Sequence, residues 1–151
     1  MNTTTNYRVS DILVAKIKEF EGCRLRAYRD SGGLLTIGVG HTKGVKAGQV
    51  ITMSQAETLL RGDILPCEKY VNGLGVCSTQ AQFDALVDFC FNLGQGSLQK
   101  SNLLQRVRCR GSENAIREEF AKWVYCKGKK LPGLVRRRQW EADRFFEEGW
   151  L

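Results

Sequence analysis

The sequence contains no long apolar run. Its first twenty residues hold an apolar stretch of only four, from Ile12 to Ala15, with polar residues on both sides. A secretory signal needs about 7–15 apolar residues, and a membrane-spanning helix needs about 20. We therefore expect no export signal and no stable membrane insertion, and we expect the protein to be made and held in the cytoplasm.

Histidine and closely spaced cysteine pairs are also scarce. His41 is the one histidine, and the six cysteines form no CxxC pair and no zinc-like spacing. No metal site and no cofactor are therefore expected. Because cytoplasmic thiols stay reduced, we expect mostly free thiols, with Cys90 packed as a core residue. A disulfide such as Cys67 to Cys77 stays open if the protein finishes its work outside the cytoplasm.

The net charge is strongly positive. It amounts to +7 over 151 residues, while the apolar content of 42% is ordinary for a globular protein. One compact domain over residues 1–151 is expected, since no repeat or low-complexity tract interrupts the chain. The charge suggests an anionic partner, which could be nucleic acid, an acidic membrane surface or an acidic cell-wall polymer. The only dense basic run is Arg136 to Arg138.

A helix is predicted over residues 10–21. Ser10 is a suitable N-cap, and Gly22 can end the helix. Glu21 falls on or beside the apolar stripe, so its carboxyl is expected to be partly desolvated, which would raise its pKa. The stripe consists of Leu13, Val14, Ile17 and Phe20.

Short strands should follow this helix. Residues 25–28 and 34–39 have strand-like patterns around a polar, glycine-containing turn at 29–33. A third strand is expected near residues 49–52. Together these segments predict a small antiparallel sheet near the amino end.

The remainder of the chain is predicted to be helical. Ser54 and Glu57 form a capping box that opens a helix, which Pro66 should kink or interrupt. Residues 79–93 carry the strongest helical stripe and should form the central core helix. The whole is therefore α+β. Further helices are expected over residues 100–108, 112–124 and 132–147.

Two carboxyl groups should have contrasting surroundings. Glu21 is expected near an apolar helix face, whereas Asp30 lies in a polar turn, and such environments separate the pKa values of two carboxyls. Glycoside hydrolysis needs one protonated acid for the leaving oxygen and one ionised carboxylate that acts on water or on the sugar. From spacing alone, a solvated helix-end glutamate and a routine turn aspartate remain the alternative.

The segments EGCRLRAYRDSGGLLTIGVGH and LPGLVRRRQWEADRFF resemble the phage-type lysozymes, or endolysins, of glycoside hydrolase family 24, which include the T-even and lambdoid-type enzymes. The resemblance spans nearly the whole chain. It implies a lysozyme-like fold with an active-site groove between two lobes. The small amino-terminal lobe would cover approximately residues 12–60. The larger helical lobe would cover approximately residues 61–151 together with the first helix.

The resemblance also implies roles for individual residues. Glu21 would be the general acid, and Asp30 would be the second carboxylate that positions water or acts as nucleophile. Thr36 would hold the catalytic water. His41 would make a structural contact in the small lobe. Beside Thr36, Gly38 has no side chain, so substrate could approach the backbone closely.

Other candidates lie in the helical part. The resemblance implies that Asn92 lines the sugar groove, while Asp88, one turn earlier, receives no firm role. Trp123 could stack on a sugar ring, although its spacing is also typical of a core residue. A basic residue of the run Arg136 to Arg138 would approach the catalytic glutamate, with Arg137 as the candidate.

The function implied by the resemblance is a muramidase that hydrolyses the β-1,4 bond between N-acetylmuramic acid and N-acetylglucosamine and lyses a bacterial host. Its partner would be peptidoglycan, and it would act as a monomer after release to the periplasm through a separate holin-type membrane protein. Two alternatives stay open. A nucleic-acid-binding module would use the Arg136 to Arg138 helix, and a lytic transglycosylase-like enzyme would need Glu21 but not Asp30.

Overall fold

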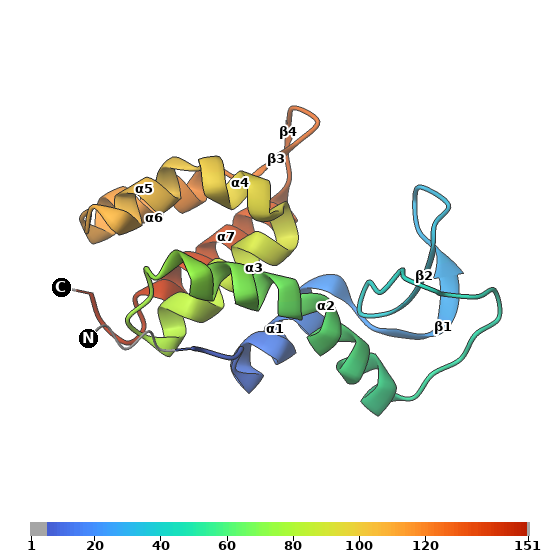
Figure 1. The fold of residues 1–151 in the computed structure, drawn as a ribbon. Coiled ribbons are helices and arrows are strands. Elements are labelled where there is room, and N and C mark those ends of the chain that lie inside the picture. The colour runs from blue at the N-terminus through green and yellow to red at the C-terminus, as the bar shows by residue number, and fades with distance from the viewer. Residues whose placement is uncertain (1–5, 151) are drawn as a thin grey trace. The chain divides into compact units, whose positions relative to one another are not determined.

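The computed structural model describes residues 6–150 (Figure 1). These residues form seven helices and two separate two-stranded antiparallel sheets, which confirms the α+β prediction. The elements are α1 (Asp11–Glu21), β1 (Arg24–Arg29), β2 (Leu35–Gly38), α2 (Met53–Leu74), α3 (Gln80–Leu93), α4 (Gln95–Lys100), α5 (Asn102–Arg108), α6 (Glu113–Ala121), β3 (Tyr125–Cys126), β4 (Lys129–Lys130) and α7 (Pro132–Phe145).

Contacts divide the described chain into two compact units. The small unit is residues 11–66, which contain α1, the β1–β2 hairpin and the first part of α2. The helical unit is residues 67–150 together with residues 6–10. The helical unit is therefore discontinuous in sequence. The organisation as one domain, with the lobe boundaries given above, stays a prediction.

Helix α1 ends at the residue that the sequence predicts. Gly22 adopts a φ of +76°, and its N–H donates to the Lys18 carbonyl at 2.8 Å. A side chain would be strained at this positive φ, which explains why glycine follows the helix. The hairpin that begins after Gly22 therefore starts at a fixed point.

Strands β1 and β2 form the predicted antiparallel hairpin, with Tyr28 opposite Thr36. The predicted third strand is wrong, because Val50 forms only an isolated bridge with Arg26. Two backbone hydrogen bonds flank this bridge, from Ala27 N–H to the Gln49 carbonyl and from Ile51 N–H to the Leu25 carbonyl, and the pairing ends there because α2 is capped at Thr52.

The core of the small unit lies between the hairpin and the start of α2. Ile37, Ile51 and Ala56 are buried together, and Gly38 fits closely against them. A Cβ on Gly38 would lie 3.4 Å from Ile51 Cδ1 and 3.5 Å from Ala56 Cβ. Partly buried side chains complete this core, namely Cys23, Leu25, Ala27, Val45 and Leu59.

Helix α2 is capped by Thr52, two residues before the predicted cap, Ser54. Thr52 Oγ1 accepts the Gln55 N–H at 3.1 Å, and Gln55 Oε1 accepts the Thr52 N–H at 2.9 Å. Ser54 therefore lies inside the helix, so the box assigned to it is wrong. Pro66 lacks an N–H for the helical ladder, yet α2 runs through it without interruption.

Helix α3 is the central helix of the helical unit, as predicted. All ten residues from Ala81 to Cys90 are buried. Thr79 caps its start, since its hydroxyl oxygen accepts the Gln82 N–H at 3.1 Å. Gly94 ends it at a φ of +96° and donates to the Cys90 carbonyl.

Helix α7 packs against both α3 and α6. Aromatic rings join these helices, because Phe89 and Phe145 each meet Phe120 edge to face, with centroids 6.2 and 6.0 Å apart. Edge-to-face pairs of this kind add to the free energy gained by burial alone. The three helices therefore share one apolar core.

Two details of the carboxyl-terminal half differ from the sequence prediction. The helix expected over 100–108 is preceded by a separate helix, α4, because Ser101 is extended and caps α5 through the Leu104 N–H at 3.1 Å. The β3–β4 hairpin was not predicted. Its turn uses Lys127 and Gly128, both at positive φ, which is the conformation of a two-residue hairpin turn.

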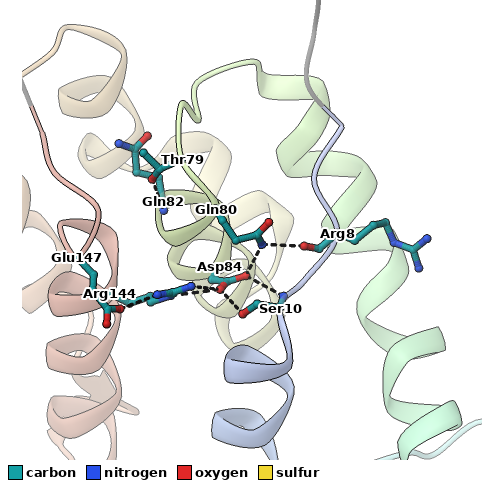
Figure 2. A network of polar contacts seen from close by, with 8 residues as sticks. All are labelled: Arg8, Ser10, Thr79, Gln80, Gln82, Asp84, Arg144 and Glu147. Atoms are coloured by element: carbon teal, nitrogen blue, oxygen red, sulfur yellow. Dashed lines mark hydrogen bonds and ion pairs between the residues drawn. The ribbon is translucent and has the colours of Figure 1, made fainter.

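A buried polar network joins α3, α7 and the segment before α1 (Figure 2). Asp84 is fully buried and accepts from Arg144 Nη2 at 2.8 Å and from Nε at 3.2 Å. It also accepts from the backbone N–H and hydroxyl of Ser10 and from Gln80. Arg144 pairs in addition with Glu147 at 2.6 Å. A buried carboxylate needs such partners to remain charged.

All six cysteines lie in the described residues as free thiols. Cys90 is buried, as predicted, and the Cys67 to Cys77 disulfide is not formed. Burial raises the pKa of the Cys77 thiol to about 12, with a further contribution from the charge of Asp84. Cys77 is therefore a protonated, unreactive thiol.

Candidate active site

Glu21 is the last residue of α1, and its side chain is exposed. Val14 and Ile17, which precede it on the helical stripe, are buried. The partial burial that this spacing predicted for Glu21 is therefore wrong, because the helix ends at Gly22 and the side chain emerges beyond the stripe. A carboxyl in this position is accessible to a large substrate.

Asp30 lies in the polar turn between β1 and β2, as predicted, and is exposed. Its Oδ1 accepts the backbone N–H groups of Gly32 and Leu34, each at 2.9 Å. The Asp30 N–H in turn donates to the Leu34 carbonyl at 2.9 Å. The turn therefore fixes the orientation of the carboxylate through one oxygen, Oδ1.

Thr36 and Gly38 lie in β2 and are both buried. The Thr36 hydroxyl donates to the Leu34 carbonyl at 2.9 Å, so its oxygen keeps lone pairs with which to accept. The glycine at position 38 is explained by its φ of +65°, at which a side chain would be strained. Its contact with substrate stays a prediction.

His41 is held through both ring nitrogens within the small unit. Nδ1 lies 2.8 Å from Asp63 Oδ2, and Nε2 lies 2.8 Å from the Lys43 carbonyl oxygen. These contacts join the end of the hairpin to α2, in keeping with the structural role predicted for His41, which stays a prediction.

The predicted site residues fall into two groups. Glu21, Asp30, Thr36, Gly38 and His41 all belong to the small unit, within 21 consecutive positions. The helical unit contains the other predicted residues, which are Asn92, Trp123 and Arg137.

Asn92 and Trp123 are each half-buried in the helical unit. The Asn92 carbonyl oxygen accepts from Arg138 Nη2 at 2.7 Å. The Trp123 ring meets Phe89 edge to face at 5.4 Å. Part of each side chain is therefore used inside the unit, and the sugar contacts of both residues stay predictions.

Arg137 and Arg138 are buried, so the run Arg136 to Arg138 does not form an exposed basic surface. Arg137 binds Asp88 through two hydrogen bonds, from Nε at 2.9 Å and from Nη2 at 2.8 Å. Arg138 pairs with Glu141 at 2.8 Å. These two arginines are therefore not available to bind nucleic acid, which argues against the alternative of a nucleic-acid-binding helix. An approach of Arg137 to Glu21 stays a prediction.

Asp88 and Glu141 share one buried cluster with these arginines. Burial raises the pKa of Glu141 well above its ordinary value, and the charge of Asp88 raises it further. Burial alone would also raise the pKa of Asp88, but hydrogen bonds with Glu141 and Arg137 outweigh it and lower that pKa. Glu141 is therefore the carboxyl that holds the proton between the two.

The stability of the protein is expected to fall as pH rises through the titration of Glu141. Its raised folded-state pKa means that the folded protein binds more protons than the unfolded chain from about pH 4.3 upward. Glu141→Gln cannot titrate, so its thermal midpoint should decline less from weakly acidic to alkaline pH. Glu118→Gln, an exposed change on α6, should follow the wild-type curve. Parallel curves for wild type and Glu141→Gln would contradict this assignment.

The sequence pattern did contain a signal for the buried charges that were missed. Asp84 and Asp88 lie one turn apart in the most apolar helix of the chain, where a solvated role is improbable. Arg137, Glu141 and Arg144 recur at helical spacing in α7. Two such patterns predict ion pairing between the helices.

Among residues 6–150, no group of three or more His, Cys, Asp or Glu side chains is arranged to hold a metal ion. No helix in this part of the chain has the length and apolar character of a membrane span.

Sequence comparison places these residues in a known family. A family model described as phage lysozyme matches residues 18–141. The chain is similar to an endolysin of Acyrthosiphon pisum secondary endosymbiont phage 1, with 39% identity over 91% of this chain and 97% of that protein. It is also similar to an endolysin of Bacillus phage B103, with 41% identity over 91% of this chain but only 53% of that protein.

The fold has solved relatives as well. The muramidase domain of SpmX from Asticaccaulis excentricus superposes with a TM-score of 0.83 at 37% identity, covering 93% of this chain and 98% of that domain. The lysozyme-like fold predicted from the sequence is thereby confirmed.

Proposed function

The chain belongs to the phage lysozyme family, and we propose that Glu21 and Asp30 carry out the reaction of this family in it. The family match includes both residues. The chain is a peptidoglycan-hydrolysing endolysin, a glycoside hydrolase of the lysozyme class. In the proposed reaction, water cleaves the β-1,4 bond between N-acetylmuramic acid and N-acetylglucosamine.

Glu21 is the proposed general acid. A general acid has to reach the glycosidic oxygen of a polymer, and the exposed position at the end of α1 supports that access. The proton goes to the leaving oxygen as the glycosidic bond breaks. The observation that carries the proposal is this exposed carboxyl, followed nine residues later by a carboxylate held in a rigid turn.

Asp30 is the proposed second carboxylate. Its Oδ1 is occupied by two backbone N–H groups, which leaves Oδ2 to act on water or on the sugar. The Thr36 hydroxyl donates its hydrogen bond to the Leu34 carbonyl, so its oxygen would accept a hydrogen bond from the water. A water held between an acceptor and a carboxylate has its lone pairs turned toward the sugar.

Asn92, Trp123 and Gly38 are proposed to contact the glycan, while His41 and Arg137 support the site structurally. The net charge of +7 favours approach to anionic peptidoglycan. We further propose that the protein is a monomer held in the host cytoplasm. A separate holin-type membrane protein would then release it to the periplasm.

Product analysis tests the proposed reaction. The purified protein is incubated with peptidoglycan, and the masses of the released muropeptides are measured by mass spectrometry. Hydrolysis gives reducing muramic acid ends, which carry the added water. Anhydro-muramic ends, which lack that water, would overturn hydrolysis in favour of a transglycosylase. The anomeric form of the first product would further distinguish inversion from retention.

Asp30→Asn is expected to reduce the hydrolysis rate about 10²-fold or more with little change in stability. The asparagine carbonyl can still accept the Gly32 and Leu34 N–H groups, so the turn is kept while the charge is lost. Initial rates on purified peptidoglycan and thermal midpoints check this. Asp11→Asn, an exposed change in the same unit, should leave the rate within about twofold. Wild-type rates for Asp30→Asn would remove it from the reaction.

A further inference from the structure

The Asn92 side chain is bound by a buried arginine. Arg138 of α7 has only 1% of its surface exposed, and its Nη2 donates to Asn92 Oδ1 at 2.7 Å. The same guanidinium contacts Glu141 twice, from Nε at 2.8 Å and from Nη2 at 2.9 Å. Its centre lies 5.2 Å from the Phe89 ring centroid, within the range of a cation–π contact. These contacts together hold the Arg138 guanidinium in one orientation.

The chemistry of the guanidinium decides how the amide of Asn92 is turned. Arginine has five N–H donors and no acceptor, so the group that faces Arg138 has to be the amide carbonyl. The Nδ2 amino group, on the other branch of the amide, then points away from Arg138 with two donors. Within residues 6–150, the Asn92 side chain makes one hydrogen bond, which is the bond from Arg138, and the side chain is half-buried.

We propose that Arg138 is a positioning residue that keeps Asn92 as a hydrogen-bond donor toward an acceptor oxygen of the glycan strand, with Glu141 as the anchor of Arg138. This inference rests on the proposed peptidoglycan hydrolysis and adds to it a direction for the contact. A freely rotating asparagine can offer either its carbonyl or its amino group. An asparagine held by Arg138 offers only donors, so it selects sugar groups that accept, such as acetamido carbonyls.

The positions of the partners support a positioning role. Asn92 lies at the end of α3, and Arg138 and Glu141 lie one turn apart on α7, which packs along α3. The orientation of a half-buried amide is thereby set by two fully buried polar side chains.

Asn92→Asp tests the donor directly. The aspartate can still accept from Arg138, but an oxygen replaces the amino group, so the bond to the glycan is lost. We expect KM on soluble glycan strands to rise about tenfold, the effect of one ordinary hydrogen bond, with an unchanged or higher thermal midpoint. Asn102→Asp makes the same chemical change at an exposed position and should leave KM within about twofold. An unchanged KM for Asn92→Asp would overturn the proposal.

Arg138→Lys tests the positioning step. A lysine lacks the planar fork that binds Glu141 and Asn92 together, so KM should rise as it does for Asn92→Asp. In the double variant the two effects should not multiply, because both remove the same donor. If the increases in KM multiply in the double variant, or if Arg138→Lys lowers stability without changing KM, Arg138 has a structural role only. If Arg138→Lys does not fold, Asn92→Asp still decides the donor role of Asn92 on which the positioning by Arg138 depends.

The wild-type measurement separates this inference from the function on which it rests. Wild-type hydrolysis of glycan strands, combined with a normal KM for Asn92→Asp, refutes the donor role alone. Absence of wild-type hydrolysis refutes the proposed function, and the inference falls with it.

Discussion

Glu21→Gln is expected to lower the rate of peptidoglycan hydrolysis by about 10²–10⁴-fold, the usual contribution of a general acid. Glutamine has nearly the same size and shape but no proton that it can transfer to the leaving oxygen. Because Glu21 is exposed at the end of α1, the variant should fold normally. A turbidity assay on outer-membrane-permeabilised Gram-negative cells measures the loss.

Glu19→Gln is the matched control for this variant. It lies on the same helix two residues earlier, its side chain is 69% exposed, and it makes the same chemical change. Its rate should stay within about twofold of the wild type. Full activity in Glu21→Gln would show that another group donates the proton. A large loss in both variants would point to the charge of this helix end instead of to proton transfer.

Asp84→Ala is expected to destabilise the protein by about 3–5 kcal/mol, because it leaves the buried Arg144 guanidinium without its main partner. For a chain of this size that corresponds to about 6–20 °C in thermal midpoint. Arg144 would keep only Glu147, whose side chain is 59% exposed. Ser10 and Gln80 would each lose one hydrogen-bond acceptor, while Gln80 keeps the Arg8 carbonyl (Figure 2).

Asp143→Ala provides the comparison, since it breaks a surface ion pair between Asp143 of α7 and Arg117 of α6. The Asp143 side chain is 61% exposed, and Arg117 keeps Glu113 as a second partner. The expected cost is about 1 kcal/mol or less. Equal thermal midpoints for the two variants would mean that the buried network contributes no more than a surface pair.

Much of the fold follows from local sequence patterns. Gly22 and Gly94 end helices where predicted, and Thr79 caps α3, because each depends on one residue and its immediate neighbours. Thr52 was missed as a cap because Ser54 offers an equally good pattern two residues later. Ile51, which precedes Thr52, packs against Ile37 of the hairpin, and a capping pattern alone does not reveal such a contact.

The candidate site was predictable in part for the same reason. Asp30 lies in a turn that its own side chain stabilises, so its exposure follows from the local sequence. The burial of Arg137 and Arg138 does not follow from their immediate neighbours, because it depends on the packing of α7 against α3, which carries Asp88, the partner of Arg137. The exposure of Glu21 was not predicted, because the apolar stripe of α1 indicates which face of the helix is buried but not at which residue the burial ends.

The ends of the described chain meet at one carboxylate, and this constrains the order in which the protein can form during synthesis. Ser10 and Arg144 both bind Asp84, and Arg8 binds Glu68. The small unit is continuous in sequence, so all of it is synthesised before the helical unit is complete. The contacts between residues 6–10 and α7 can form only after α7 has emerged from the ribosome, and such long-range contacts are slow to close.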